Sequence, residues 1–334
     1  MKLITKKKSE FKILISLMII MVILSQSAFA QNVSPLQTGH NMTDFINVRD
    51  MAKMAPGLDV ILYNYYAKSN RYANKDGKIQ NKVIIDTLNA SLSLNISTIA
   101  TVPAIYWGSK FTFLGGANYV VGIVPSYYWA KGNININQGG GNIDTLYSDN
   151  VEFKLSGLGD FFFTPLGLSW GWKHFDATFY YGITAPTGRY ETGADDNIGL
   201  GFWTNQFQGY GYWYPNESQA TAFMLGLTYE LNGKIKGEDF KPGNRFSLEY
   251  GISHYIDERL EISIMGGNNW QTSDDTGSDV FYDPSYHDRL GSLAFGIAYW
   301  AVKERLYVAA KYMYDYGGRQ RFLTHGMMIN LIYV

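Results

Sequence analysis

The 334-residue chain contains no cysteine, which excludes disulfide bonds, thiolate metal sites and a cysteine nucleophile. It also lacks an excess of basic residues, because 28 Lys and Arg face 29 Asp and Glu, for a formal net charge of −1. A chain without a net positive charge to neutralise phosphates is a poor nucleic-acid binder. No Pro/Ser-rich linker, charge run or change in composition divides the sequence, so we expect a single folded unit.

Long apolar runs are also missing after the N-terminus. The one run, Ile13 to Leu24, follows five lysines and precedes the small-residue pattern Ser27-Ala28-Phe29-Ala30. It is shorter than the roughly 20 residues that a spanning helix needs, so it predicts a signal peptide over residues 1–30, cleaved after Ala30. Removing it leaves 23 basic and 28 acidic residues, a net charge of −5. We therefore expect an exported, mildly acidic protein.

What the sequence has in abundance is β-strand alternation. From Phe175 to Thr184, aromatic and apolar residues alternate with Asp176, Thr178 and other small or polar residues. Side chains in a strand point to opposite faces with period two. Runs of about 9 to 11 residues are long enough to cross a bilayer as tilted strands. With 26 Tyr, 35 Gly and a mean hydropathy of −0.15, the chain predicts an all-β transmembrane barrel in which alternate residues meet lipid.

Twelve antiparallel strands are predicted in this single barrel, which would extend over residues 57–334. They fall near residues 58–68, 83–101, 111–131, 160–171, 174–186, 200–212, 218–232, 244–256, 260–271, 288–301, 305–315 and 320–334. Long polar connections, among them 132–159, alternate with short turns, among them 102–110. This pattern is typical of outer-membrane barrels with long outer loops and both termini in the periplasm. Aromatic residues gather at both ends of the strands, as expected for girdles at the two membrane interfaces.

Strand parity divides the residues between the lipid face and the lumen. Charge on the lipid face at mid-depth would cost about 2 to 4 kcal/mol for Arg or Lys. The polar face of each strand must therefore line the interior. Five charged residues are predicted there, either to select a permeant or to pair with one another and rigidify the barrel: Asp176, Arg245, Glu249, Glu261 and Lys311.

Residues 31–56 are too polar for a lipid-facing strand, and two roles are open for them. They can form a disordered periplasmic tail, as termini often do. Alternatively they can fold up from the periplasmic side as a plug, with Arg49 and Asp50 pairing with interior charges. A twelve-stranded barrel is wider than the eight-stranded kind that its own side chains fill, so it has room for such a plug.

Several motifs with possible chemistry are better explained by the barrel. Gly167-Leu168-Ser169-Trp170-Gly171 matches the nucleophile elbow of hydrolases, but a second strand follows where the elbow needs a helix. The acidic loops around Asp195 and Asp274 could hold Ca²⁺ through oxygen ligands, but they lack the full spacing and the terminal Glu of an EF-hand loop. We expect solvated loops that divalent ions bridge to lipopolysaccharide. The sequence predicts no catalytic residues, metal site or cofactor.

Other segments carry a resemblance to a known family. The motifs are Gly157-Leu158-Gly159-Asp160, Ala185-Pro186-Thr187-Gly188, Asn197-x-Gly199 with Trp203, Asn47-Val48-Arg49-Asp50, Phe246-Ser247-Leu248-Glu249-Tyr250 and Asp274-Asp275-Thr276-Gly277. In order and spacing they resemble the family named for the MetA pathway of phenol degradation. One departure is that the chain ends Tyr333-Val334, where barrel proteins usually end on an aromatic residue.

The resemblance implies an outer-membrane barrel with a channel or uptake role. The leading hypothesis is a non-enzymatic channel for passive uptake of small apolar or aromatic compounds. The alternative is a structural or surface-interaction barrel with a closed lumen, in which loop 132–159 does the work. A barrel enzyme using Ser169 is the third hypothesis. The expected partners are outer-membrane lipid, lipopolysaccharide, the barrel-insertion machinery and small hydrophobic or aromatic solutes.

Overall fold

The computed structural model describes residues 39–334 except 86–89, 141–142, 195, 281 and 334. The predicted signal peptide and residues 31–38 therefore lie outside the described residues. The strands are β1 (Gly57–Ala73), β2 (Ile79–Gln80), β3 (Val83–Ile85), β4 (Ala90–Phe113), β5 (Ala117–Val124), β6 (Tyr127–Gly140), β7 (Ile143–Leu158), β8 (Phe161–Gly171), β9 (Phe175–Ala185), β10 (Thr204–Trp213), β11 (Thr221–Asn232), β12 (Arg245–Tyr255), β13 (Leu260–Gln271), β14 (Arg289–Val302), β15 (Leu306–Arg319) and β16 (Arg321–Tyr333).

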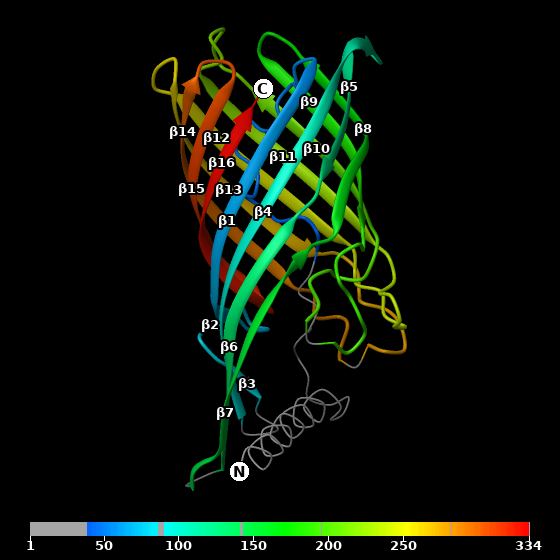
Figure 1. Cartoon of the computed structure of the whole chain (residues 1–334), viewed down its shortest axis with the longest axis vertical. Coiled ribbons are helices and arrows are strands. Elements are labelled where there is room, and N and C mark those ends of the chain that lie inside the picture. The colour runs from blue at the N-terminus through cyan, green and yellow to red at the C-terminus, as the bar shows by residue number, and fades with distance from the viewer. Residues whose placement is uncertain (1–38, 86–89, 141–142, 195, 281, 334) are drawn as a thin grey trace, which may run out of the picture.

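These strands form one closed, twelve-stranded antiparallel barrel (Figure 1). Neighbours in sequence pair from β8 to β16, and β16 pairs with β1, which pairs with β4 and closes the wall. The segments β5 and β6 occupy a single position in the wall and are separated at Pro125-Ser126, as β7 and β8 are at Gly159-Asp160. No helix in the described part of the chain is long and apolar enough to span a membrane.

The predicted strands are confirmed in number, but two predicted boundaries are wrong. Residues 102–110 are not a turn, because β4 continues to Phe113 and turns at Leu114, Gly115 and Gly116. All three turn residues have positive φ, 45°, 79° and 94°, and two adjacent glycines adopt such angles without a steric cost. Residues 132–159 are not an open loop, since most of them form the hairpin of β6 and β7 that extends beyond the barrel (Figure 1).

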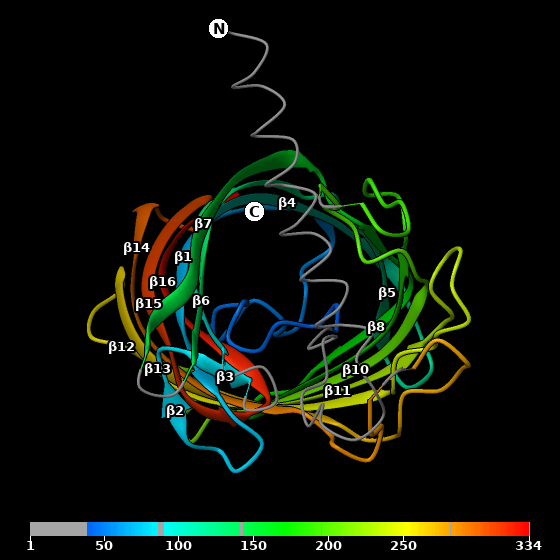
Figure 2. The ribbon, with the colours of Figure 1, turned by 90° about the horizontal axis from the view of Figure 1, so that it is seen from below.

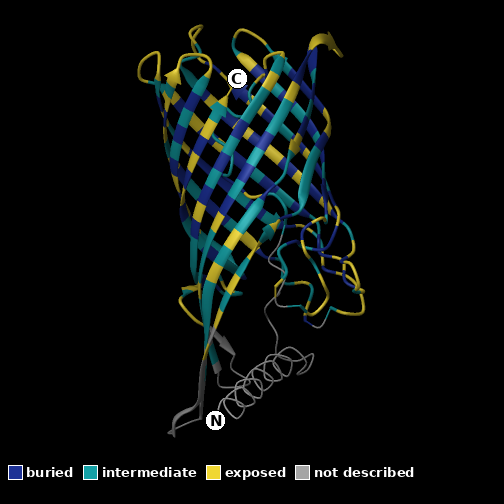
Figure 3. Ribbon diagram, viewed as in Figure 1, coloured by how far each residue is buried: buried dark blue, intermediate teal, exposed yellow. Residues whose placement is uncertain are grey.

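The burial pattern alternates along most of the wall, most regularly in β10, β11 and β12, and gives the ribbon a chequered appearance (Figure 3). In β12, Arg245, Ser247 and Glu249 are buried in the lumen, whereas Tyr250 and Ile252 are exposed on the outside. The lumen positions of Asp176, Arg245, Glu249, Glu261 and Lys311 follow the predicted parity. The barrel is therefore apolar outside and mixed inside, as a lipid-embedded wall requires.

Aromatic residues do gather near the strand ends, but only part of them faces outward. Trp107, Trp213 and Tyr299 are exposed at the end of the barrel that carries the short turns. Their neighbours Tyr106, Tyr212 and Tyr214 point into the lumen, as do Tyr63, Tyr65, Tyr128, Tyr180 and Tyr210. Adjacent residues of a strand face opposite sides, so an aromatic pair supplies one side chain to each surface. The inner wall is thus rich in tyrosine.

The described N-terminal segment, residues 39–56, lies inside the barrel (Figure 2). Gly39 contacts Glu230 and Arg245 at the long-loop end, and Met54 lies against Gly108 at the short-turn end. The segment therefore runs the length of the lumen toward the short turns, where β1 starts at Gly57. This course differs from the expectation that it folds up from the short-turn side. Only tertiary contacts with the wall, described below, determine its direction.

The long connections pack on one another beyond the barrel. Phe202, Ile235, Phe240 and Tyr282 come from three different connections, and they form a second small hydrophobic core with Tyr190, Leu200 and Val280 around it. Ordering long loops costs conformational entropy, and the free energy gained by burying these apolar side chains offsets that cost. The long-loop end is consequently a folded structure and not a set of independent loops.

Candidate functional site in the barrel lumen

Four of the five predicted lumen charges form hydrogen bonds with the N-terminal segment. Glu249 accepts a hydrogen bond from the backbone N–H of Asp44 at 3.0 Å. Glu261 accepts one from the Arg49 guanidinium at 2.8 Å, and the hydroxyl of Tyr307 also donates to this carboxylate. Buried charges need such partners, because leaving water without compensation costs several kcal/mol per ion.

Lys311 binds the segment through its main chain. Its ammonium donates to the carbonyl oxygens of Phe45 at 2.9 Å and Ile46 at 2.6 Å, and also to that of Asp44. An ammonium has three donors and no acceptor, so three converging carbonyls satisfy it completely. The turn at residues 44–46 is therefore held against β15.

Arg49 is bound on several sides. Its guanidinium donates to Ser253 Oγ at 2.9 Å and to the carbonyls of Gln219 and Ala220 at 3.0 and 2.9 Å. The guanidinium carbon also lies 4.9 Å from the ring centroid of Tyr255, a cation–π distance. With Glu261 these contacts fix the segment near the short-turn end.

Among the described residues, Asp50 forms no ion pair with an interior cation, which corrects that part of the plug hypothesis. Its carboxylate accepts hydrogen bonds from the Tyr63 hydroxyl at 2.7 Å and from the backbone N–H of Asn47 at 2.8 Å. The Lys311 ammonium is instead directed at the carbonyls of residues 44–46. A local turn thus satisfies Asp50, and sequence spacing could not distinguish the two arrangements.

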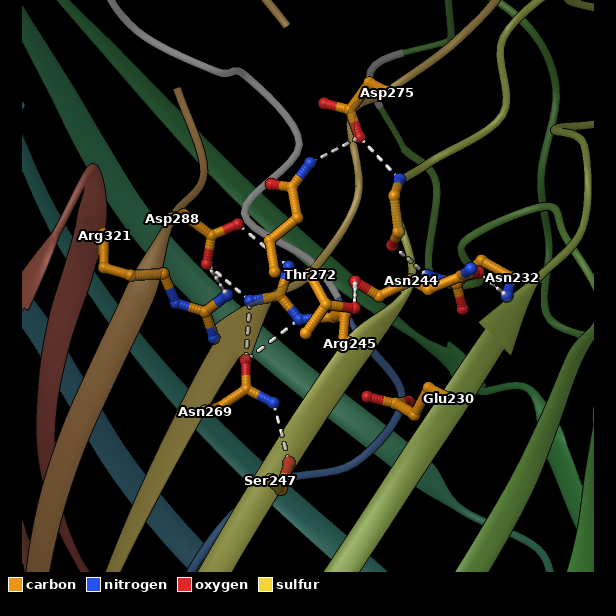
Figure 4. Close-up of polar contacts among 12 residues, drawn as sticks. Glu230, Asn232, Asn244, Arg245, Ser247, Asn269, Thr272, Asp275, Asp288 and Arg321 are labelled. Atoms are coloured by element: carbon orange, nitrogen blue, oxygen red, sulfur yellow. Dashed lines mark hydrogen bonds and ion pairs between the residues drawn. The ribbon is translucent and has the colours of Figure 1, made fainter. Parts of the chain in front are cut away.

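The remaining two predicted residues lie at opposite ends of the barrel. Asp176 accepts hydrogen bonds from the Tyr214 hydroxyl at 2.7 Å and from the Lys53 backbone N–H at 3.1 Å, near the short turns. Arg245 lies at the long-loop end, where its guanidinium donates to Asp288 and to Asn269 (Figure 4). The five residues therefore do not form one selectivity site.

The Arg245 network connects the wall to the loops. Asp288 also receives Arg321 at 3.2 Å, and it lies just before β14 begins (Figure 4). Burial alone would raise the pKa of Asp288, but the two guanidiniums outweigh it and lower that pKa. The carboxylate therefore stays charged and ties β12 and β16 to the loop.

A cavity of about 420 Å³ lies in the lumen beside the N-terminal segment. Six aromatic side chains line it: Phe45, Tyr63, Tyr106, Tyr128, Phe162 and Tyr210. Met42, Met51, Ile61 and Val102 add apolar surface. The polar lining residues are His40, Asn41, Ser126, Asp160, Thr184, Gln206, Gln208 and Glu249. A concave, mainly apolar site with few polar groups is the usual form of a small-molecule site.

Asp160 contacts several separate segments, and strand parity did not predict this role. Its carboxylate accepts hydrogen bonds from the N–H groups of Gly188 at 2.9 Å and Leu200 at 2.8 Å, and it lies 3.2 Å from His40 Nε2. Burial would raise its pKa, but these hydrogen bonds outweigh burial and lower it. Three of the motifs that carry the family resemblance thus converge here. Their occurrence in one family resemblance was the only sequence signal.

Two of these motifs, Ala185-Pro186-Thr187-Gly188 and Asn197-x-Gly199, are in direct backbone contact. A Cβ atom built on Gly188 would lie 2.7 Å from the Cα atom of Gly199, so both positions need glycine. This contact folds residues 186–203 over the break between β7 and β8, beside the long-loop end of the cavity. Ile198 and Leu200 of that loop line the cavity.

The fold is similar to that of a solved outer-membrane channel. The COG4313 outer membrane channel from Pseudomonas putida F1 has a TM-score of 0.60 and 12% identity, over 86% of this chain and 98% of that chain. The CymD monoaromatic hydrocarbon channel has a TM-score of 0.42 and 7% identity, over 92% of this chain and 98% of that one. A Pseudomonas aeruginosa FadL homologue has a TM-score of 0.39 and 12% identity, with coverages of 83% and 90%.

No curated protein sequence matches this chain. A family model does match, over residues 73–331, which is well over half of the chain. The matched region begins at the last residue of β1 and reaches into β16, so it contains the wall from β4 onward, the loops and Asp160. The chain therefore belongs to the family described as "Putative MetA-pathway of phenol degradation".

Proposed function

We propose that this protein is an outer-membrane channel for passive uptake of small apolar or aromatic compounds. The observation that carries the proposal is the 420 Å³ cavity in the lumen, whose lining includes six aromatic side chains. An apolar solute gains free energy by leaving water for such a surface, at about 25 cal/mol per Å² buried. Among the described lining residues the carboxylates are Asp160 and Glu249, which do not make the charged ring that selects ions.

The exposed apolar band on the outside of the barrel supports a location in the outer membrane. In this orientation the long connections face the cell exterior and the short turns face the periplasm. The cavity then lies nearer the cell exterior than the middle of the N-terminal segment does. Asp160, Ile198 and Leu200 are among its lining residues. This arrangement suits capture from outside.

We further propose that residues 39–56 act as a plug. The segment occupies the lumen along its length and is bound there by Lys311, Glu249, Glu261 and Asp176. Such a plug would exclude ions and large solutes while leaving an apolar cavity beside it. The role explains why the lumen charges contact the segment and not a common permeant site.

Uptake into proteoliposomes with lipopolysaccharide in the outer leaflet would test the channel. We expect the barrel to accelerate entry of radiolabelled toluene far more than entry of glucose. The matched control is Gln208→Arg, which places a long charged side chain in the cavity and should slow toluene entry. Equal rates for toluene with and without the barrel would refute the proposal.

One observation favours the alternative, a barrel that acts through surface interactions. The hairpin of β6 and β7 extends beyond the barrel, and within the described residues β7 pairs only with β6 (Figure 1). An unpaired strand edge can add a strand from a partner. Toluene entry that is slowed by Gln208→Arg, but unchanged when residues 131–154 are deleted, would favour the channel over this alternative.

A further inference from the structure

The lumen holds a second cavity, of about 300 Å³, on the short-turn side of the N-terminal segment. Arg49, Lys53, Tyr180 and Tyr255 are among its lining residues. The two cavities share three lining residues, Met51, Ile61 and Tyr106. The cavities therefore meet at one apolar constriction, contributed by the segment, β1 and β4.

The N-terminal segment is bound asymmetrically across the lumen. Residues 43–49 are hydrogen-bonded to β12 through β16: Thr43 to Ser292 at 3.0 Å, Asp44 to Glu249, Asn47 to Asn330 at 3.0 Å, and Arg49 to Glu261. The opposite side of the segment faces β1, β4 and β5, where Ile61, Val102, Ala104 and Val124 present apolar side chains. Polar contacts to β12–β16 thus hold residues 43–49, and the larger cavity lies between the segment and β1, β4 and β5.

The constriction is made of side chains that can move on a fixed main chain. The carbonyl of Met51 accepts a hydrogen bond from Thr178 at 3.0 Å, which holds its backbone. The methionine side chain itself is unbranched and flexible. Tyr106 lies flat over Gly122, its cross-strand neighbour on β5, since a Cβ atom at Gly122 would overlap the Tyr106 ring. The glycine lets the ring lie back against the wall.

We propose that Met51, Ile61 and Tyr106 form the gate of a route that runs beside the N-terminal segment and not through the space it occupies. A small apolar solute binds in the larger cavity, passes the gate when the Met51 and Tyr106 side chains change rotamer, and leaves through the smaller cavity. The segment stays bound to β12–β16 throughout. This inference rests on the proposed channel function and names the residues that set its rate.

The chain provides a matched set of variants for this gate. Gly122→Ala should push the Tyr106 ring off the wall into the constriction and slow toluene entry by about tenfold, the scale of a small-to-large change in a packed site. Tyr106→Ala should raise the rate above that of the wild type. The double variant should match Tyr106→Ala, because no ring remains to be displaced. Gly296→Ala, on the lumen face of β14 outside the two large cavities, is the control and should match the wild type.

Heat-modifiable electrophoretic mobility confirms that each variant is a folded barrel before transport is measured. If Gly122→Ala slows entry and the double variant remains equally slow, distortion of β5 is responsible and the gate is wrong. Unchanged rates in both single variants would also overturn the gate while leaving the channel function intact. If the wild type transports no toluene, the channel function itself fails.

Discussion

Arg49 illustrates how single residues connect the segment to the wall. It is four-fifths buried and is shared by Glu261, Ser253, two backbone carbonyls and the Tyr255 ring. Its charge could be recognised in the sequence, but its partners come from residues up to 212 positions away. Removing one member of such a set leaves the other groups without a partner, which is the costly event.

We therefore predict that Arg49→Gln loosens the segment by about 1 to 3 kcal/mol, since Glu261 would be left without its cation. In planar bilayers, the variant should show larger and more frequent conductance openings than the wild type. Arg49→Lys keeps the charge but not the multiple donors, so it should give an intermediate effect. Lys68→Gln, a charge removal on β1 far from the segment's ion pairs, serves as control. Identical traces for wild type and Arg49→Gln would contradict the prediction.

Among the elements, the N-terminal segment differs most from what its composition suggests. It has no regular strand or helix between residues 39 and 56, yet Thr43, Asp44, Val48, Met51 and Met54 are buried. Its stability comes mainly from contacts with the wall, because its few internal backbone hydrogen bonds, such as that from Ala52 to Arg49, do not offset the loss of conformational entropy.

Deletion of residues 32–53 tests the plug at the scale of the whole element. The wall strands pair with one another and not with the segment, so the barrel should still assemble. Single-channel conductance and antibiotic sensitivity should both rise, because the lumen of a twelve-stranded barrel is too wide for its own side chains to fill. The amount of heat-modifiable barrel serves as the control. Unchanged conductance in a correctly assembled deletion would eliminate the plug.

The whole molecule depends on a separation of faces that extends around the wall. Leu248 of β12 lies on the outward face, whereas Gln208 of β10 lies in the lumen next to the cavity. Lipid surrounds the Leu248 side chain, whereas the lumen and its cavity surround the Gln208 side chain. Assembly in a membrane should therefore discriminate strongly between the same substitution at the two positions.

We predict that Leu248→Arg prevents or greatly reduces insertion, at a cost of about 2 to 4 kcal/mol for an arginine at mid-depth on the lipid face. Gln208→Arg should assemble normally even though it slows toluene entry. Heat-modifiable mobility of outer-membrane fractions measures both outcomes. Equal loss of folded barrel in the two variants would show that the assigned faces are wrong.

The alternation of polar and apolar residues determined the local properties of this protein. It indicated the class of the fold, the twelve wall positions and the inward orientation of Asp176, Arg245, Glu249, Glu261 and Lys311, because strand parity is a property of neighbouring residues. The glycines at 115 and 116 were visible, but the continuation of β4 to them was not, since pairing with β1 and β5 decides it.

The tertiary structure alone decided everything that depends on contacts across the lumen. The course of residues 39–56 depends on contacts with distant strands, and Asp160 joins two separate connections. The Asp50–Tyr63 hydrogen bond and the inward direction of the tyrosines also arise only when the segment lies in the closed barrel. The β6–β7 hairpin belongs to the same group, because a polar glycine-rich and asparagine-rich stretch is compatible with either loop or strand until a partner is present. The cavities and their shared gate are likewise a property of the closed barrel, since their linings come from the N-terminal segment and from strands between β1 and β16.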